Sequence, residues 1–213
     1  CRKRYLITVN AEIGADIGAN LNYPHGNGWR ADNRAQLRGG LYGSLYLKKI
    51  GVYVGCNISS MKLDADKNFN ELSAKYFNNI TDTDKNIAFN STSIKIPLVF
   101  LYRLNSKVSL GMGPEYRYMF ITDKQKILSN ANNVFNNSAV GLVFNADFQC
   151  LHNIKITGNY SLGVTSFNKT TNLGAWKENT LSIGVKYLFT SKHIWRLPHC
   201  LNWVIPIVPS WLR

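Results

Sequence analysis

The sequence predicts an all-β fold, an eight-stranded antiparallel up-and-down barrel that spans a membrane. Three observations predict it: segments that alternate apolar and polar residues, connections that alternate in length, and charged residues that balance on one face. With 213 residues, 45% of them hydrophobic, the chain can form one sizeable domain and does not have the composition of a disordered protein. It has no run of about 18 apolar residues, so a helical membrane span is excluded.

The alternation is most regular over residues 7–23, ITVNAEIGADIGANLNY, where every odd position is apolar and every even position is polar or Gly. Successive side chains of a strand point to opposite faces, so this segment predicts a strand with one apolar and one polar wall. The apolar wall can face a protein core or lipid. Seven further segments repeat the pattern: 35–47, 52–58, 93–104, 108–120, 138–150, 154–167 and 179–189.

The connections decide between these two environments. Short ones at 48–51, 103–107 and 151–153 alternate with long ones, of which 61–91 is the longest. Outer-membrane barrels have this layout, with short periplasmic turns and longer external loops. The alternative is a soluble lipocalin-like barrel that binds a small apolar ligand, but such barrels lack the strict alternation.

The polar wall carries equal numbers of acids and bases, and an eight-stranded barrel is only wide enough for side chains. We therefore expect a barrel-interior charge network that plugs the lumen. Its members are Glu12, Asp16, Arg38, Lys95, Glu115, Arg117, Asp147 and Lys186. A turn centred on Asn105 would place Lys95 opposite Glu115 and predicts a salt bridge between them.

The net charge of +13 is concentrated at one predicted rim. The long loops hold ten bases against eight acids, whereas the amino end, the short turns and the tail hold bases alone. A basic rim suits anionic lipid headgroups, and the interleaved aromatics suit membrane interfaces, which argues against nucleic-acid binding. The rim bases are Arg2, Lys3, Arg4, Lys48, Lys49, Arg103, Lys107, Lys155, Lys192, Arg196 and Arg213.

The last predicted strand contains SIGVKYLF at 182–189, in which Ser182 and Gly184 precede the aromatic residues Tyr187 and Phe189. This strand resembles the insertion signal that the barrel-assembly machinery recognises in outer-membrane proteins. Residues 5–189 are thus similar to small barrels of the OmpA/OmpX type, and 93–120 resembles the PorT-like domain common in Bacteroidetes. The resemblance implies an outer-membrane protein whose partners are outer-membrane lipids and the assembly machinery. In those families the signal strand ends the protein, whereas here further residues follow.

We therefore divide the chain into a basic stub at 1–4, the barrel at 5–189 and an irregular tail at 190–213. The prolines of the tail rule out a continuous helix. Because the chain begins at Cys1 without a signal peptide, we expect a processed product or a trimmed piece of a longer chain. Cys56 and Cys150 lie on the apolar phase of their strands, and we expect them to act as small hydrophobes.

No catalytic, cofactor or metal site is predicted. Ser44 lies on the inner wall near the turn end, far from His25 in the first long loop, so a Ser/His pair is not supported. We expect a non-enzymatic protein with a role in membrane support, adhesion, or secretion or surface assembly. Loop 61–91 is the candidate contact for an envelope or surface protein, because among its charges it carries the apolar residues Phe69, Leu72, Tyr76 and Phe77.

Overall fold

A computed structural model describes residues 6–26, 29–30, 32–65, 88–121, 136–168 and 175–198. Within these ranges the chain forms β-strands and no helix, so none could cross a membrane as a helix. The strands are β1 (Leu6–His25), β2 (Trp29–Arg30), β3 (Asp32–Leu47), β4 (Ile50–Ala65), β5 (Ala88–Arg103), β6 (Val108–Ile121), β7 (Ser138–Leu151), β8 (Ile154–Gly163) and β9 (Lys177–Pro198).

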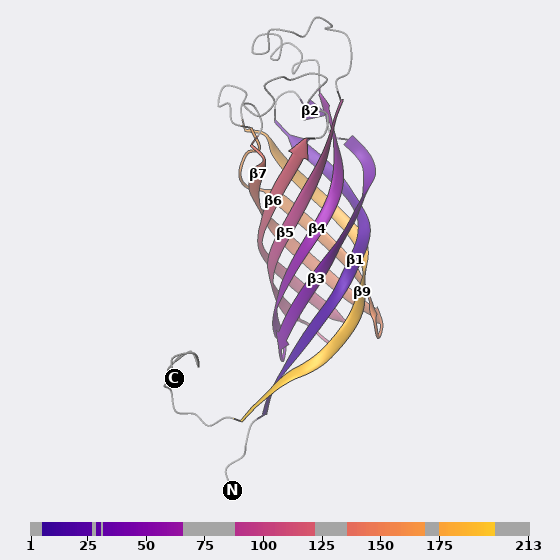
Figure 1. The fold of residues 1–213 in the computed structure, drawn as a ribbon, viewed down its shortest axis with the longest axis vertical. Coiled ribbons are helices and arrows are strands. Elements are labelled where there is room, and N and C mark those ends of the chain that lie inside the picture. The colour runs from indigo at the N-terminus through magenta and orange to yellow at the C-terminus, as the bar shows by residue number, and fades with distance from the viewer. Residues whose placement is uncertain are drawn as a thin grey trace, which may run out of the picture.

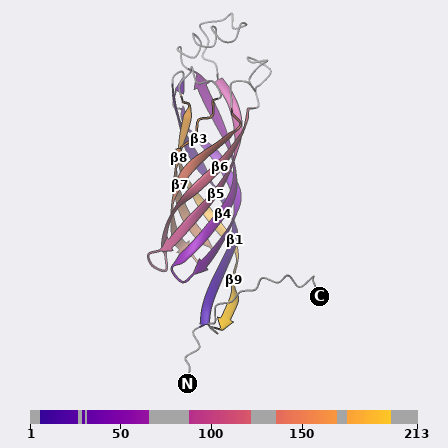
Figure 2. The ribbon, with the colours of Figure 1, turned by 90° about the vertical axis from the view of Figure 1, so that its left-hand side faces the viewer.

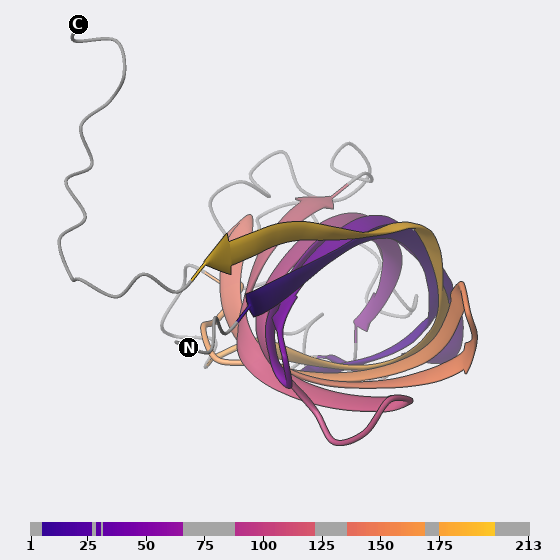
Figure 3. The ribbon, with the colours of Figure 1, turned by 90° about the horizontal axis from the view of Figure 1, so that it is seen from below.

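The eight long strands close into one antiparallel up-and-down barrel (Figures 1 and 3). Neighbours in the chain pair with each other, and β9 pairs back onto β1 to close the ring. The short β2 adds a two-residue pairing to β4, with Trp29 opposite Ala65. The predicted fold class is confirmed.

The polar wall of each strand lines the interior, and the apolar wall faces outward. In β1, Ile13 and Ile17 are 55% and 66% exposed, whereas Glu12 and Asp16 are buried. Large apolar side chains are exposed on all eight long strands, so the outward belt is continuous around the barrel. A soluble barrel would bury this wall, and the lipocalin-like alternative is therefore wrong. An apolar belt of this extent is stable in lipid.

The short turns lie at one end of the barrel, together with the ends of β1 and β9 nearest the termini (Figures 1 and 2). They are Lys48–Lys49 between β3 and β4, residues 104–107 between β5 and β6, and His152–Asn153 between β7 and β8. The longer connections, such as residues 66–87, join strand ends at the opposite rim. We call these two ends the turn side and the loop side.

The last strand continues beyond Phe189, where we expected the barrel to end. The pairing of β8 with β9 stops at Ile154 opposite Tyr187, and the register between β1 and β9 shifts by one residue at Phe189. Beyond this bulge, β9 pairs with β1 alone, while β1 stays paired with β3 as far as Val9 opposite Leu47. From there, Leu6 to Thr8 and residues 196–198 continue as a two-stranded ribbon past the turn side (Figure 1). The start of the expected irregular tail is therefore strand up to Pro198. Residues 1–5 and 199–213 lie outside the described residues.

One strand is shorter than its pattern predicts. The pattern extends to residue 167, but β8 ends at Gly163. The carbonyl of Val140 accepts hydrogen bonds from the amides of both Val164 and Thr165, so the chain leaves the ladder there.

Candidate functional site

The barrel interior is the candidate site, because eleven charged side chains of the described residues converge there. All eight members of the expected network lie inside and are buried. Three more join them: Arg103, Lys155 and Glu178. The interior thus holds five acids and six bases, and its charges nearly balance.

The predicted salt bridge between Lys95 and Glu115 is wrong. In the ladder Lys95 lies opposite Arg117, and Glu115 lies opposite Pro97. The reason is the turn, in which Arg103 pairs with Ser109, so its centre is one residue later than expected. Lys95 Nζ instead lies 3.3 Å from Glu178 Oε1, and Glu115 Oε1 lies 2.6 Å from Arg117 Nε.

The assignment of Arg103 and Lys155 to the basic rim is also wrong, and Glu178, which directly precedes the predicted strand 179–189, belongs to the same interior network. Lys155 and Glu178 are each 5% exposed, and the Arg103 side chain reaches Glu12. Each of these three residues lies at or next to the end of its strand and two residues from an inward-facing neighbour, as Arg103 follows Val99 and Leu101 on β5. Extending the period to the strand ends would have placed all three inside.

On the turn side, Glu12 is the centre of the charge network. Its Oε1 lies 2.8 Å from Arg103 Nη2, and its Oε2 lies 2.5 Å from Lys155 Nζ. Ser44 Oγ donates a hydrogen bond to Oε2 at 3.1 Å. The Arg103 guanidinium also stacks on the ring of Tyr46, 3.6 Å from its centroid, in a cation–π contact. One carboxylate thus connects four strands.

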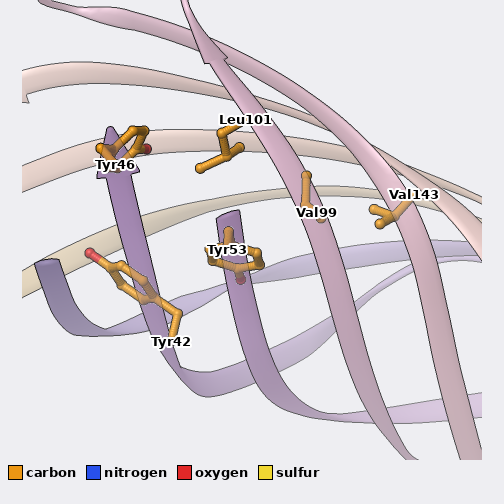
Figure 4. Close-up of a cluster of buried hydrophobic side chains, with 6 residues drawn as sticks. All are labelled: Tyr42, Tyr46, Tyr53, Val99, Leu101 and Val143. Carbon is orange, nitrogen blue, oxygen red and sulfur yellow. The ribbon is translucent and has the colours of Figure 1, made fainter. Parts of the chain in front are cut away.

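Aromatic and aliphatic side chains fill the rest of the turn side (Figure 4). This plug consists of Tyr42, Tyr46, Tyr53, Val99, Leu101 and Val143, all at most 5% exposed. The rings of Tyr42 and Tyr53 stack at 5.8 Å. Glycines provide the space, since a Cβ on Gly51 would lie 2.6 Å from the Tyr46 ring. The sequence pattern predicts a polar inner wall and does not reveal this plug.

The centre of the lumen joins the plug to a second charge pair. Lys186 Nζ lies 4.3 Å from the centroid of the Tyr53 ring and 2.9 Å from Asp147 Oδ1. Asn145 Nδ2 donates to Asp147 Oδ1 at 3.2 Å. Further toward the loop side, Arg38 Nη1 lies 3.4 Å from Asp16 Oδ2. Charges therefore also pair at mid-height.

The loop side is filled by charged and hydroxyl side chains together with the buried apolar side chains of Met119, Phe167 and Trp176. Glu178 interacts with two cations, Lys95 at 3.3 Å and Arg117 at 3.6 Å. Lys95 Nζ also donates to Thr180 Oγ1 at 2.9 Å. Nearby, the hydroxyls of Ser59 and Ser93 are 2.9 Å apart. Because Lys95 is on β5 and Glu178 is on β9, these contacts cross the lumen.

The remaining spaces are small. One cavity of about 20 Å³ lies beside Asn20, Arg38 and Asn57, and another of about 20 Å³ lies at the turn-side mouth beside Arg103 and Lys155. Each is large enough for about one water molecule. Buried Asn20 Oδ1, Asn57 Oδ1 and Arg38 Nε have no protein hydrogen-bond partner and adjoin the first cavity, as expected for a hydrated site.

The predicted insertion-signal residues divide between the two walls of β9. Ser182 faces the interior, whereas Tyr187 and Phe189 are exposed on the outer wall at the turn side, and Gly184 packs beside Gly18 of β1. The proposed partner residues Phe69, Leu72, Tyr76 and Phe77 lie outside the described residues.

The structure also places the groups that could serve catalysis or bind metal. His25 is exposed at the loop side, where its Nε2 is 2.9 Å from Asn179 Nδ2. Ser44 lies on the turn side, where its hydroxyl donates a hydrogen bond to Glu12. No cluster of three His, Cys, Asp or Glu side chains in the described residues could hold a metal ion. Cys56 and Cys150 are free thiols exposed on the outer wall.

A closed barrel of eight strands, with an apolar outer belt, a charged interior and short turns at one rim, defines the class. The chain is an integral β-barrel protein of the bacterial outer membrane.

No family model and no curated protein matches the sequence. Among solved structures, the chain is similar to the attachment invasion locus protein Ail of Yersinia pestis, solved in complex with the heparin analogue sucrose octasulfate. The two are 14% identical with a TM-score of 0.48, and the match covers 84% of this chain and 99% of Ail. OprG of Pseudomonas aeruginosa is 12% identical with a TM-score of 0.46, over 88% of this chain and 96% of OprG. Neisserial surface protein A is 11% identical with a TM-score of 0.44, over 85% of this chain and 97% of that protein. These values support no statement about function.

Proposed function

We propose that this barrel is a non-enzymatic membrane scaffold that acts through its external loops, in adhesion or in a surface or secretion assembly. One observation carries the proposal: side chains fill the lumen from the turn side to the loop side. Glu12 joins β1 to β5 and β8, and Glu178 joins β9 to β5 and β6. A barrel filled in this way is suited to holding loops and is not suited to passing solutes.

The connection between β4 and β5 is the first candidate for the contact. Residues 66–87 separate the two strands, whereas two residues connect β3 to β4 at the other rim. Its sequence carries four large apolar side chains, Phe69, Leu72, Tyr76 and Phe77, among charged residues. The resemblance of 93–120 to the PorT-like domain supports assembly over adhesion.

The test has two parts. In planar bilayers the purified barrel should give no conductance steps, and stable open channels would contradict the sealed scaffold. In intact cells of the native host, a photo-crosslinker at Tyr76 should give a discrete adduct with an envelope or surface protein. The same crosslinker at Phe144, which is exposed on the outer belt, is the control and should react with lipid. Identical products at both positions would contradict a loop contact.

A further inference from the structure

Among the described residues, no acid lies on the outer rim of the turn side. Five of the twelve acids line the lumen. Two more, Asp32 and Asp64, lie at the loop-side ends of β3 and β4. The remaining five, at positions 66, 71, 82, 84 and 123, belong to the long connections that join loop-side ends.

The bases at the turn side therefore have no acid to neutralise them. Lys48, Lys49 and Lys107 are all exposed and occupy two of the three turns. Arg103 and Lys155 do not contribute, because both are paired with Glu12 inside the lumen. Further bases adjoin this rim in the sequence: Arg2, Lys3 and Arg4 precede β1, and Lys192 and Arg196 belong to β9 beyond its bulge.

Backbone hydrogen bonds tie these turns to the neighbouring strands. The Arg103 amide donates to the Lys49 carbonyl at 2.7 Å, and the Gln149 amide donates to the Lys107 carbonyl at 2.7 Å. The Lys107 amide is itself bound by Asn105 Oδ1 at 2.8 Å. The three lysines are thus held on an arc of the rim that spans β3 to β7.

The apolar belt reaches this arc without a polar gap. Leu47 and Ile50, which flank the first two lysines, are 48% and 64% exposed, and Leu104 in the next turn is 50% exposed. Tyr102, at the end of β5, is also exposed on the outer wall. With these neighbours in the hydrocarbon, the lysine side chains extend into the headgroup layer.

We propose that the turn-side rim, through Lys48, Lys49 and Lys107, binds the headgroups of anionic phospholipids in the periplasmic leaflet. The occupant is phospholipid because the cations lie directly against lipid-facing residues and no acid of the described residues on that rim competes for them. Each such cation near an anionic surface contributes a salt-dependent attraction. This inference concerns the rim opposite to the loops and does not depend on the loop contact proposed above.

The test uses the full chain in nanodiscs that contain phosphatidylcholine and phosphatidylglycerol. Electron spin resonance of spin-labelled lipids measures which lipid the barrel surface retains. We expect a preference for phosphatidylglycerol of roughly two- to five-fold at low salt, falling toward one in high salt. The variant K48N/K49Q/K107Q should lose it. Asn is chosen at position 48 because Lys48 has φ 56°, a backbone conformation that Asn tolerates.

The matched control, K62Q/K67Q/K177Q, removes three positive charges from the loop side and should retain the preference. Equal retention of both lipids by the unmodified protein, or loss in the control alone, would overturn the proposal. Folding of the triple rim variant is judged by migration of the unboiled protein on a gel. If that variant does not fold, K107Q alone should reduce the preference for phosphatidylglycerol. An unchanged preference in K107Q would contradict the proposal. Equally tight binding of a short DNA duplex to the rim in neutral nanodiscs would show a general polyanion site and overturn the lipid assignment.

Discussion

The two halves of the lumen are closed by different chemistry. On the turn side a plug of three tyrosines and three aliphatic residues packs around one carboxylate, Glu12, that neutralises two cations. On the loop side, Glu178 lies within a network of cations and hydroxyls, and the apolar packing is limited to Met119 and the aromatic pair Phe167 and Trp176, whose ring centroids are 5.9 Å apart. The same two-residue period therefore produces mainly apolar packing in one half and a mainly polar network in the other.

The comparison teaches where the barrel depends on single residues. The turn side combines tight packing with one shared acid, so a single truncation there creates a cavity or an unpaired charge. The loop side has redundant partners, because Glu178 has two cations and Lys95 also has Thr180. We expect the turn side to dominate stability. The measurement throughout is the free energy of unfolding by urea in lipid vesicles, followed by tryptophan fluorescence.

Truncation of the plug should have the largest effect. Tyr46 is 1% exposed and lies beneath the Arg103 guanidinium. Tyr46→Ala removes a buried ring and should lower the free energy of unfolding by about 3–5 kcal/mol. Tyr102→Ala is the control, because that ring is near the same rim but 49% exposed on the outer wall. Equal losses in the two variants would show that the plug does not stabilise the barrel.

Neutralisation of Glu12 should rank second. Glu12→Gln leaves Lys155 buried without its counter-charge, whereas Arg103 is partly exposed and retains some water. We expect a loss of about 3 kcal/mol. Adding Lys155→Met in the same chain should recover part of the loss, because it removes the stranded charge. A double variant that loses the sum of the two single losses would contradict the pairing.

Removal of Lys95 should cost less. Lys95→Met leaves Glu178 with Arg117 and Thr180, so the carboxylate stays compensated. We expect a loss of about 1 kcal/mol. The matched variant, Glu178→Gln, strands Lys95 and weakens a contact of Arg117, and should cost more. If Lys95→Met is as damaging as Glu12→Gln, the loop side is not redundant.

The sequence was sufficient for the strands and for the inside of the barrel, because a period of two assigns each side chain to one wall. It was insufficient for partners across the lumen. The pair Lys95 and Glu178 comes from β5 and β9, which are not neighbours, so their contact depends on the tilt and closure of the barrel. The turn register failed for a local reason, since a shift of the centre by one residue moves every partner by two.

The tyrosine plug shows a second limit. Tyr42 lies on the wall that the pattern assigns to the interior, but an aromatic residue there can face water or pack against others. Packing requires the space that Gly14 and Gly51 leave, and a Cβ on Gly14 would lie 2.7 Å from the Tyr42 ring. Gly14 lies opposite Tyr42 in the pairing of β1 with β3, and Gly51 lies opposite Tyr46 in the pairing of β3 with β4, so the fit becomes visible only when the register of these strands is known.

Loss of one neutral hydrogen bond should have the smallest effect and tests the loop side most finely. Ser59 and Ser93 are each 3% exposed, and their hydroxyls are 2.9 Å apart across β4 and β5. Ser59→Ala should cost about 0.5–1.5 kcal/mol, because the Ser93 hydroxyl then keeps only a weak bond, at 3.5 Å, to the Ser59 carbonyl. The double variant should cost less than the sum of the two single losses, since no hydroxyl remains unpaired.

Ser60→Ala on the outer wall is the control and should be neutral. Strict additivity would mean that a water molecule, and not the partner serine, satisfies each hydroxyl, and the loop side would then be wetter than its small cavity implies.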